Sequence, residues 1–438
     1  MRSAPKLAFA ASVLFAAGMW LYFERVLVPH QVMEAARHGT PRGSLSDLYP
    51  RWLGARELLL NGRDPYSPEI TREIQSGYYG RPLDPTRAGD PGDQQAFAYP
   101  VYVVFLLAPT IKLPFAEVQE GFRWFLGALT VLSLLIWLRF VRWQPSLPKL
   151  GTLVLLTLST VAFIQGIKLQ QLSLLVAGLI AGAVYLLTRN SQLLAGVLLA
   201  LATIKPQLAV PLMAWLSLWS LSHFPQRWKF LISFAATCLG LILAGECLLP
   251  GWIEGFWNAI GAYRRYTEPG TVLDQLLTAK IGVPLSVLIV IAVAMICVRW
   301  RTSPVASSQF AWTTSLVLAA TVVIVPTVAP YNQLLLLPGA VLLARNCNSP
   351  SHTTWPVRVL VGMAAGCLVW PWIAATGLAV ASFFTPAAQR FGYLPLWTSV
   401  MMPVSFTACL LILAARGQPD LGGEIQVVEE RNHLATGH

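Results

Sequence analysis

The sequence predicts an all-α polytopic membrane protein of about twelve transmembrane helices, with one long polar loop after the first of them. Of its 438 residues, 55% are apolar and only 12% are charged, against about 45–50% and about 25% in soluble proteins. The apolar residues gather in stretches of about 17 to 25, the length that crosses a bilayer as a helix. Basic residues recur in the short links between these stretches, and this pattern predicts their orientation.

Nine stretches predict clear crossings: residues 7–28, 121–141, 150–166, 172–188, 230–249, 281–298, 309–325, 357–378 and 395–415. The first exceeds the apolar part of a signal peptide, and no clear cleavage site follows Val28, so we expect it to be an anchor. Residues 331–345 end in Arg345 and predict a shorter crossing.

The apolar segment 193–221 is interrupted by Lys205-Pro206-Gln207, and it predicts either one broken helix or a hairpin of two short helices. Arg189 precedes the segment and Arg227 follows it. Because links rich in Lys or Arg belong on the cytoplasmic side, both ends of the segment are expected inside. The segment is then a hairpin with Lys205 at its outer tip.

Residues 101–115 are apolar enough to cross the membrane, but they contain Pro109 and Pro114 and follow Pro100. A crossing here would put the basic link 139–149 outside, so we expect this segment to lie in the interface or to re-enter. Both termini are then cytoplasmic. The chain divides into a first transmembrane helix (1–29), an outer loop (30–120), a transmembrane bundle (121–416) and a disordered cytoplasmic tail (417–438).

Composition and spacing exclude several other classes of protein. The net charge is +11, but the basic residues stand singly between apolar runs, so we expect no nucleic acid partner. The six cysteines form no CxxC pair, and no His, Asp and Glu cluster has metal-ligand spacing. We therefore expect no metal and no cofactor, and we find no P-loop and no GxSxG motif.

The first outer loop is the segment nearest to a domain. Residues 30–97 hold eight Arg and nine Asp or Glu, and within them 46–62 predicts an amphipathic helix on the membrane surface. Ser46 or Asp47 is expected to cap this helix, and Asn61-Gly62 to end it. Residues 77–95, rich in Gly, Pro, Arg and Asp, predict a flexible flap. Asp47 itself has two interpretations, an ordinary N-cap or a catalytic base.

Four spaced motifs carry a resemblance to a known family. They are Asp47-Leu48 with Gly54 to Tyr66, then Phe97-Ala98-Tyr99-Pro100, Ile204-Lys205-Pro206-Gln207, and Tyr331-Asn332-Gln333-Leu334-Leu335. In this order they resemble the signature of glycosyltransferase family 87, the DUF2029 group. The sequence departs from that signature at Leu48, where the family usually has Phe, and at Val101, where it has a second Pro.

The resemblance implies a helical bundle of the GT-C superfamily whose long first outer loop carries interfacial helices. Such enzymes use polyprenyl-phosphate-linked sugars, often mannose, to build glycolipids or glycans outside the cytoplasmic membrane. They carry an acidic residue early in the first outer loop as the presumed base, and Asp47 matches that place. The implied activity is an inverting transfer of a hexose, with mannose the first choice, from a polyprenyl-phosphate sugar to a lipid or glycan acceptor.

This chemistry needs a base for the acceptor hydroxyl and a cation for the departing phosphate. Lys205 is the candidate cation, or else a lysine that snorkels from a helix end. Arg264 and Arg265 offer a second phosphate contact, or a surface for lipid headgroups. Arg56 has two interpretations as well: it binds phosphate, or it pairs with neighbouring side chains of its own helix.

Other polar residues of the same face are candidates for substrate binding: Tyr99, Gln171, Gln207, Tyr331 and Asn332. Their amides and hydroxyls can bind sugar hydroxyls, or they can join helix ends. Two further interpretations compete with an enzyme. One is a polytopic lipid or solute transporter or flippase, although we find one broken segment and no convincing internal repeat. The other is a scaffold without activity.

Overall fold

A computed structural model describes residues 4–37, 46–84, 86–87, 90–91, 93–266, 270–346 and 355–416, so the tail predicted at 417–438 lies outside them. These residues form helices and contain no strand, which confirms the all-α prediction. Among them, six helices are long and apolar enough to cross a membrane. A seventh is added if α7 (Leu147–Leu158) and α8 (Val161–Lys168), bent by 54°, count as one span. The chain thus has the helices of a polytopic membrane protein, and the count of twelve stays a prediction.

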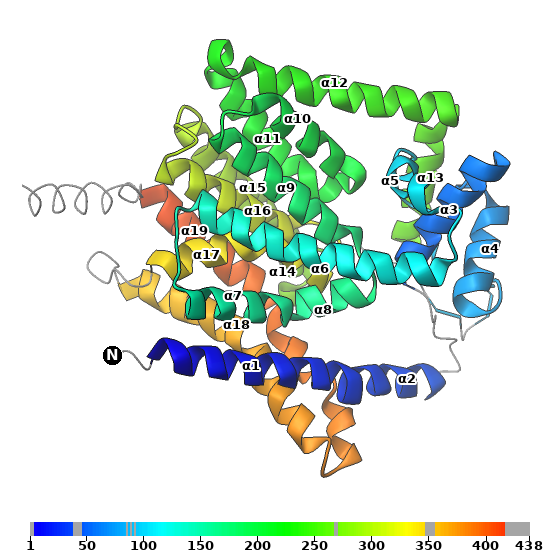
Figure 1. Cartoon of the computed structure of the whole chain (residues 1–438), viewed down its shortest axis with the longest axis horizontal. Coiled ribbons are helices and arrows are strands. Elements are labelled where there is room, and N and C mark those ends of the chain that lie inside the picture. Colours follow the sequence, from blue (N-terminus) through cyan, green and yellow to red (C-terminus); the bar gives the residue numbers. More distant parts are fainter. Residues whose placement is uncertain are drawn as a thin grey trace, which may run out of the picture.

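The first predicted crossing is part of a longer rod. Helix α1 (Ala4–Tyr22) continues through a π-helical turn (Phe23–Leu27) into α2 (Val28–Arg37), and the rod lies along one side of the bundle (Figure 1). It packs against α7 and α18 (Trp355–Ala381). The Tyr22 hydroxyl donates a hydrogen bond to the carbonyl of Gly392, which ties the π-helical turn to the 3₁₀ turns Pro386–Phe391 and Leu394–Ser399.

Two helices form the centre of the bundle. Helices α9 (Leu172–Thr188) and α16 (Ser308–Ile324) are buried on nearly all faces because their sequences are apolar all round. Helix α9 packs against α6 (Phe115–Phe140) and α10 (Gln192–Leu201). Helix α16 packs against α11 (Pro206–Ser222), α15 (Ala279–Trp300) and α19 (Met401–Arg416). The ends of α9 and α16 therefore have little freedom to move.

The segment interrupted at Lys205 folds back on itself, as the hairpin interpretation predicts. Helix α10 and a 3₁₀ turn (Ala202–Ile204) lead to Lys205, and α11 leads away from it. The first end of the segment lies beside α12 (Phe224–Leu248), because Gln192 Nε2 donates to the Gln226 carbonyl (2.8 Å) and Ser233 Oγ to the Leu193 carbonyl (2.7 Å). The second end lies there too, because α11 ends at Ser222 and α12 begins two residues later. With about 25 Å of α11 between Lys205 and these ends, Lys205 lies at the opposite end of the bundle.

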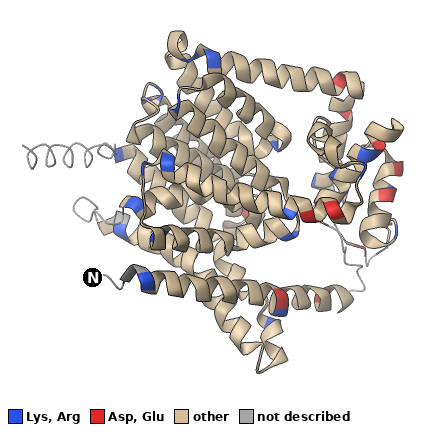
Figure 2. Ribbon diagram, viewed as in Figure 1, with Lys and Arg blue, Asp and Glu red and all other residues tan. Residues whose placement is uncertain are grey.

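The short basic links gather at the end away from Lys205. Arg227 Nη2 donates to the Thr302 carbonyl (3.3 Å) and Arg299 Nη1 to that of Ala415 (2.9 Å), while Arg345 bonds the Val141 carbonyl. In Figure 2, Lys and Arg occur at both ends of the bundle, whereas most Asp and Glu lie at the end opposite the N-terminus. The links that we expect on one side of the membrane are therefore on one end of the molecule.

Short helices close the end that carries Lys205 (Figure 1). They are α3 (Leu48–Asn61), α4 (Pro68–Tyr79), α5 (Val103–Leu107) and α13 (Trp252–Tyr266). The short helix α14 (Val272–Leu277) follows α13 along the chain and packs against α15, α16 and α19. As predicted, α3 ends at Asn61, followed by Gly62 in the left-handed region (φ 64°), which glycine adopts without strain. The segment 101–115 contains α5 and a 3₁₀ turn (Ala108–Thr110). At about 1.5 Å per residue neither can cross a bilayer, as the interfacial prediction requires.

The predicted short crossing 331–345 is divided in two. A 3₁₀ segment (Pro330–Leu336) precedes α17 (Leu337–Asn346), and this 3₁₀ segment packs against α8, α9 and α16. Its first turn brings Tyr331 and Asn332 to the end of the bundle that carries Lys205.

Candidate active site at the end of the bundle

A cavity of about 530 Å³ opens where α3, α9, α11 and α13 meet the 3₁₀ segment that begins at Pro330. It brings together eight of the ten residues singled out in the sequence. They are Asp47, Tyr99, Gln171, Lys205, Gln207, Arg264, Tyr331 and Asn332.

Gln171 links the two charged groups at the centre of this cavity. Its amide NH₂ donates to the Asp47 carboxylate, and its amide oxygen accepts from Lys205 Nζ (2.8 Å). Only this orientation of the amide suits both partners, because a carboxylate only accepts and an ammonium only donates. A carboxylate and an ammonium are thus held on the two sides of one buried amide.

A second chain of hydrogen bonds holds Lys205 from the protein side. Lys205 Nζ donates to Ser173 Oγ (2.8 Å), and Ser173 Oγ donates to Asn332 Oδ1 (2.8 Å). All three residues are buried. The ammonium also lies over two aromatic rings, 5.1 Å from the centre of Tyr331 and 5.7 Å from that of Tyr99, and such rings attract a cation.

The local sequence explains why Lys205 points into the cavity. The residue before a proline is driven out of the helical region, and Lys205 has φ −122° and ψ 80°. Pro206 then occupies the first position of α11, where its missing N–H has no partner to lose. The Lys-Pro pair therefore breaks the helix and presents the lysine at the break.

Three helices begin at this cavity. Asp47, Gln171 and Lys205 each occupy the N-cap position, before the first residues of α3, α9 and α11 respectively. Helix N-termini carry unpaired N–H groups and a partial positive charge, so their convergence favours an anion.

The expectation that the Asp47 side chain caps α3 is wrong. Asp47 is at the N-cap position, but its side chain makes no capping hydrogen bond, because the carboxylate turns to Gln171 instead. Ser46 does not cap the helix either, since its hydroxyl has no partner among the described residues. Burial raises the pKa of Asp47 above its usual range, and the neighbouring Arg51 and Lys205 only partly offset this.

Sequence reasoning missed Arg51, a second cation of the cavity. Its guanidinium lies 4.6 Å from the centre of the Tyr99 ring, and Nη1 donates to the Asp47 carbonyl (2.6 Å). Arg51 follows Asp47 by four residues and thus shares its face of α3. This four-residue spacing is the feature of the sequence that could have pointed to Arg51 as a residue of the site.

The Gly-Arg-Asp-Pro-Tyr motif (62–66) positions Tyr99. The Asp64 carboxylate accepts from the Tyr66 N–H (2.9 Å), and the Tyr66 hydroxyl donates to the Tyr99 carbonyl (2.7 Å). Tyr66 fits closely against α13, because a Cβ on Gly255 would lie 2.8 Å from its ring. Burial raises the pKa of Tyr99 to about 12, so its hydroxyl stays protonated.

Two of the ten singled-out residues are not placed at this cavity. Arg56 lies over the Trp52 ring, 5.3 Å from its centre, and does not line the cavity. Its assignment to substrate is therefore not supported. The side chain of Arg265 lies outside the described residues.

Further lining residues were not foreseen. Ser173 holds Lys205, while Asp93 and Gln95 line the cavity from the segment expected to be a flap. Trp252 and Trp257 line it too, although we expected tryptophans mainly at the membrane interface. Single residues of this kind carry no sequence signal until the fold brings them together.

The cavity continues sideways into an open groove between α12 and α13. Ile242, Ile253 and Trp257 line both spaces, and Ile253 and Trp257 are 43% and 62% exposed. Apolar side chains thus line the groove where it meets the cavity, and the rest of its lining consists of Leu243, Gly251 and the polar residues Glu246, Glu254 and Asn258. The α12 side of this groove belongs to a helix with only 6% of its apolar window buried inside the protein. A polar cavity thus opens toward an apolar flank of the bundle.

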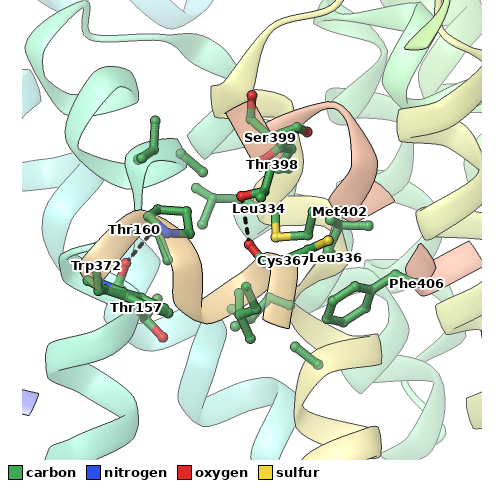
Figure 3. Close-up of a pocket in the computed structure, with 17 residues that line it drawn as sticks. Thr157, Thr160, Leu334, Leu336, Cys367, Trp372, Thr398, Ser399, Met402 and Phe406 are labelled. Carbon is green, nitrogen blue, oxygen red and sulfur yellow. Dashed lines mark hydrogen bonds between the residues drawn. The ribbon is translucent and has the colours of Figure 1, made fainter. Parts of the chain in front are cut away.

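A second, smaller pocket lies between α7, α18 and α19 and has a volume of about 80 Å³ (Figure 3). None of its 17 lining residues is Asp, Glu, Lys, Arg or His. The Thr398 hydroxyl donates to the Cys367 carbonyl (2.9 Å), so it is already paired. The lining of this pocket contains no charged side chain, in contrast to the cavity around Asp47.

The described residues contain no group of three or more His, Cys, Asp and Glu that could hold a metal ion. The chemistry that the described residues provide at one end of the bundle comes from two carboxylates, three cations and several amides.

Fold and site together define a polytopic helical membrane protein with a charged cavity that opens to its apolar flank. Residues 97–327 match the model of glycosyltransferase family 87, and the chain therefore belongs to this family. The protein is a glycosyltransferase, and its placement in the GT-C superfamily is consistent with this membership. Family membership favours the enzyme over the transporter and the scaffold. Neither a curated protein nor a solved structure matches the chain. The matched range includes Tyr99, Gln171 and Lys205, while Asp47 lies before it and Tyr331 after it.

Proposed function

We propose that the protein transfers a hexose, with mannose the first choice, from a polyprenyl-phosphate sugar to a lipid or glycan acceptor. The observation that carries this proposal is the passage from the charged cavity to the apolar groove at Ile242, Ile253 and Trp257. A donor with a phosphate next to a long hydrocarbon chain fits both spaces at once. A water-soluble nucleotide sugar would leave the apolar groove without a function.

Several features favour a phosphate near Lys205. Lys205 and Arg51 both face the Tyr99 ring, and α9 and α11 begin at the same place. A positioned cation and helix N-termini stabilise the negative charge that grows on a leaving phosphate. Arg264 also lines the cavity and offers a further contact from α13.

Asp47 is proposed as the general base. The acceptor hydroxyl gives its proton to the Asp47 carboxylate, and its oxygen forms a bond to the anomeric carbon of the donor. The bond between that carbon and the phosphate oxygen breaks, and the electron pair stays on polyprenyl phosphate, opposite Lys205. A direct displacement of this kind inverts the anomeric centre. The raised pKa of Asp47 suits this role, because a more basic carboxylate accepts a proton more readily.

We also propose that the site faces the outside of the cytoplasmic membrane, with both termini in the cytoplasm. This orientation is favoured by the basic links 139–149, 227–229, 299–301 and 345–358, which belong inside. Lipid-linked sugars are the donors that suit an outer face, since nucleotide sugars are made in the cytoplasm.

The test is transfer of radiolabelled sugar by purified protein from a panel of polyprenyl-phosphate hexoses into lipid extract. We expect incorporation with wild type and none with Asp47→Asn. Asp84→Asn is the matched control, since Asp84 lies in the same outer loop but does not line the cavity.

Asp47→Asn is expected to fold, because a neutral amide at a buried position avoids the cost of burying a charge. For a carboxyl with a raised pKa, the charged form destabilises the folded state above that pKa. Removing the charge should therefore leave thermal stability unchanged or increased. Full activity of a folded Asp47→Asn protein would refute the assignment of the base, and transfer from nucleotide sugars alone would refute the donor class.

A further inference from the structure

The outer loop contributes a folded rim to the cavity where the sequence predicted a flexible flap. Gln75 Nε2 donates to the Gln94 carbonyl (2.9 Å), and Gln75 Oε1 accepts from the Leu83 N–H (3.0 Å). The Tyr79 hydroxyl donates to the Asp93 carbonyl (2.6 Å). The described residues of this stretch are thus tied to α4 at several points.

A partly buried ion pair strengthens the same rim. Arg81 Nη1 donates to Asp90 Oδ2 (2.9 Å), and the Asp84 N–H donates to the same oxygen (2.7 Å). The hydrogen bond from Arg81 lowers the pKa of Asp90 to about 2, so the pair stays charged at any working pH. These contacts give Asp93 and Gln95, which follow, a defined position at the cavity.

Gln95 lines the cavity, and its side chain contains a buried hydrogen-bond acceptor without a partner among the described residues. Its side chain is 95% buried, and Nε2 donates to Asp93 Oδ2 (2.7 Å). The carboxylate can only accept, so the amide nitrogen must face Asp93 and the amide oxygen must face away. That oxygen has no hydrogen-bond partner among the described residues. A buried acceptor without a donor is costly, so a ligand with a donor group is expected there.

The cations and Asp93 reach the cavity from different segments. Arg51 and Lys205 lie beside the Tyr99 ring and suit the phosphate of a donor. Asp93 lines the cavity from the rim that follows α4, where its carboxylate accepts from the N–H and the side-chain amide of Gln95. A carboxylate repels phosphate, so the surface at Asp93 suits an uncharged ligand with hydrogen-bond donors.

We propose that Asp93 and Gln95 form the acceptor subsite and bind neighbouring hydroxyl groups of an uncharged sugar whose reacting hydroxyl lies at Asp47. This inference rests on the proposed glycosyl transfer and adds the chemical class of the acceptor. Asp93 retains acceptor capacity, because a carboxylate has about four lone-pair sites and Gln95 uses two of them. An acceptor with a phosphate or carboxylate beside the reacting hydroxyl is disfavoured by the charge of Asp93.

The test compares Gln95→Leu and Asp93→Asn with wild type in initial-rate kinetics. The acceptors are neutral alkyl hexosides and their phosphorylated counterparts, and the donor is the polyprenyl-phosphate hexose used by wild type. Gln94→Leu is the matched control, since Gln94 neighbours Gln95 but does not line the cavity.

We expect Gln95→Leu to raise the KM for the neutral hexoside at least tenfold, with the donor KM changed less than twofold. Asp93→Asn should also raise the acceptor KM, and it should narrow the preference for neutral over phosphorylated acceptors. Gln94→Leu should behave as wild type. An unchanged acceptor KM in both variants, or a change confined to the donor KM, would overturn the subsite.

Equilibrium binding of the same hexosides without donor separates this inference from the proposed reaction. Hexoside binding that weakens at least tenfold in Gln95→Leu supports the subsite, even if wild type transfers no sugar from any donor tested. Equal binding by wild type and Gln95→Leu overturns the subsite, even if transfer and its dependence on Asp47 are established.

Discussion

Replacing Gln171 by leucine tests whether one amide aligns the carboxylate and the ammonium. Gln171 donates to the Asp47 carboxylate and accepts from Lys205 Nζ at 2.8 Å. Leucine has a similar size but makes neither hydrogen bond. The variant therefore leaves both charges in the cavity and removes only the link between them.

The magnitude follows from the two hydrogen bonds lost. A hydrogen bond to a charged group contributes about 1.5–3 kcal/mol, so two of them amount to about 3–6 kcal/mol. Lys205 keeps its bond to Ser173, and Asp47 can reach water in the cavity, so the lower end of this range applies. Since about 1.4 kcal/mol corresponds to tenfold in rate, kcat/KM should fall about 100-fold.

The assay is sugar transfer by purified protein, with thermal unfolding in detergent as the control for folding. Gln192→Leu is the matched substitution, because Gln192 pairs with the Gln226 carbonyl at the far end of the bundle. We expect Gln192→Leu to keep its activity. A folded Gln171→Leu protein within threefold of wild type would refute the role of this amide.

Three further predictions address the cation, the base and the packing. Lys205→Met should lower kcat about 10²–10³-fold, because this is the usual effect of removing one preorganised group that stabilises charge in the transition state. An unchanged kcat in steady-state kinetics would contradict the role of Lys205. A base works only when deprotonated, so kcat/KM should fall as pH drops through the pKa of Asp47, which burial raises. A pH profile whose acidic limb lies at or below about 3.9, the value for an unperturbed aspartic acid, would exclude Asp47 as the base. Gly196→Ala should destabilise the protein by about 1–3 kcal/mol, because its Cβ would lie 2.7 Å from the Phe230 carbonyl oxygen of α12. Gly240→Ala is the control and should not destabilise the protein, because its Cβ would meet no atom within 4 Å. Equal melting temperatures of the two variants in detergent would contradict the close packing of α10 on α12.

Local features of the structure follow from local sequence. The Lys205-Pro206 pair predicted a break in an apolar segment, because proline acts on the backbone of its immediate neighbour. The Asn61-Gly62 pair predicted the end of α3, because glycine adopts a positive φ without strain. The prolines near residues 101–115 made a crossing doubtful, and the basic link 139–149 decided against it; α5, in this segment, has five residues.

Asp47 illustrates where local rules fail. Aspartate before a helix is a common N-cap, and the sequence placed it at that position correctly. Its carboxylate instead bonds Gln171, which is 124 residues away along the chain. The choice between the two partners depends on the fold, which brings the N-termini of α3 and α9 to one cavity, and no local pattern contains that information.

The sequence alone determined the helical class and the apolar segments, because hydropathy acts over a few residues. It also predicted the hairpin with Lys205 at its turn, because the basic residues at both ends of that segment belong on one side of the membrane. Only the tertiary structure revealed Arg51, Ser173 and Gln95 as parts of the site. Ser173, for example, reaches Asn332 across 159 residues of sequence. Such contacts arise when helix ends meet in a packed bundle. The energetic contribution of each buried polar group there depends on its hydrogen-bond partners and not on its neighbours along the chain.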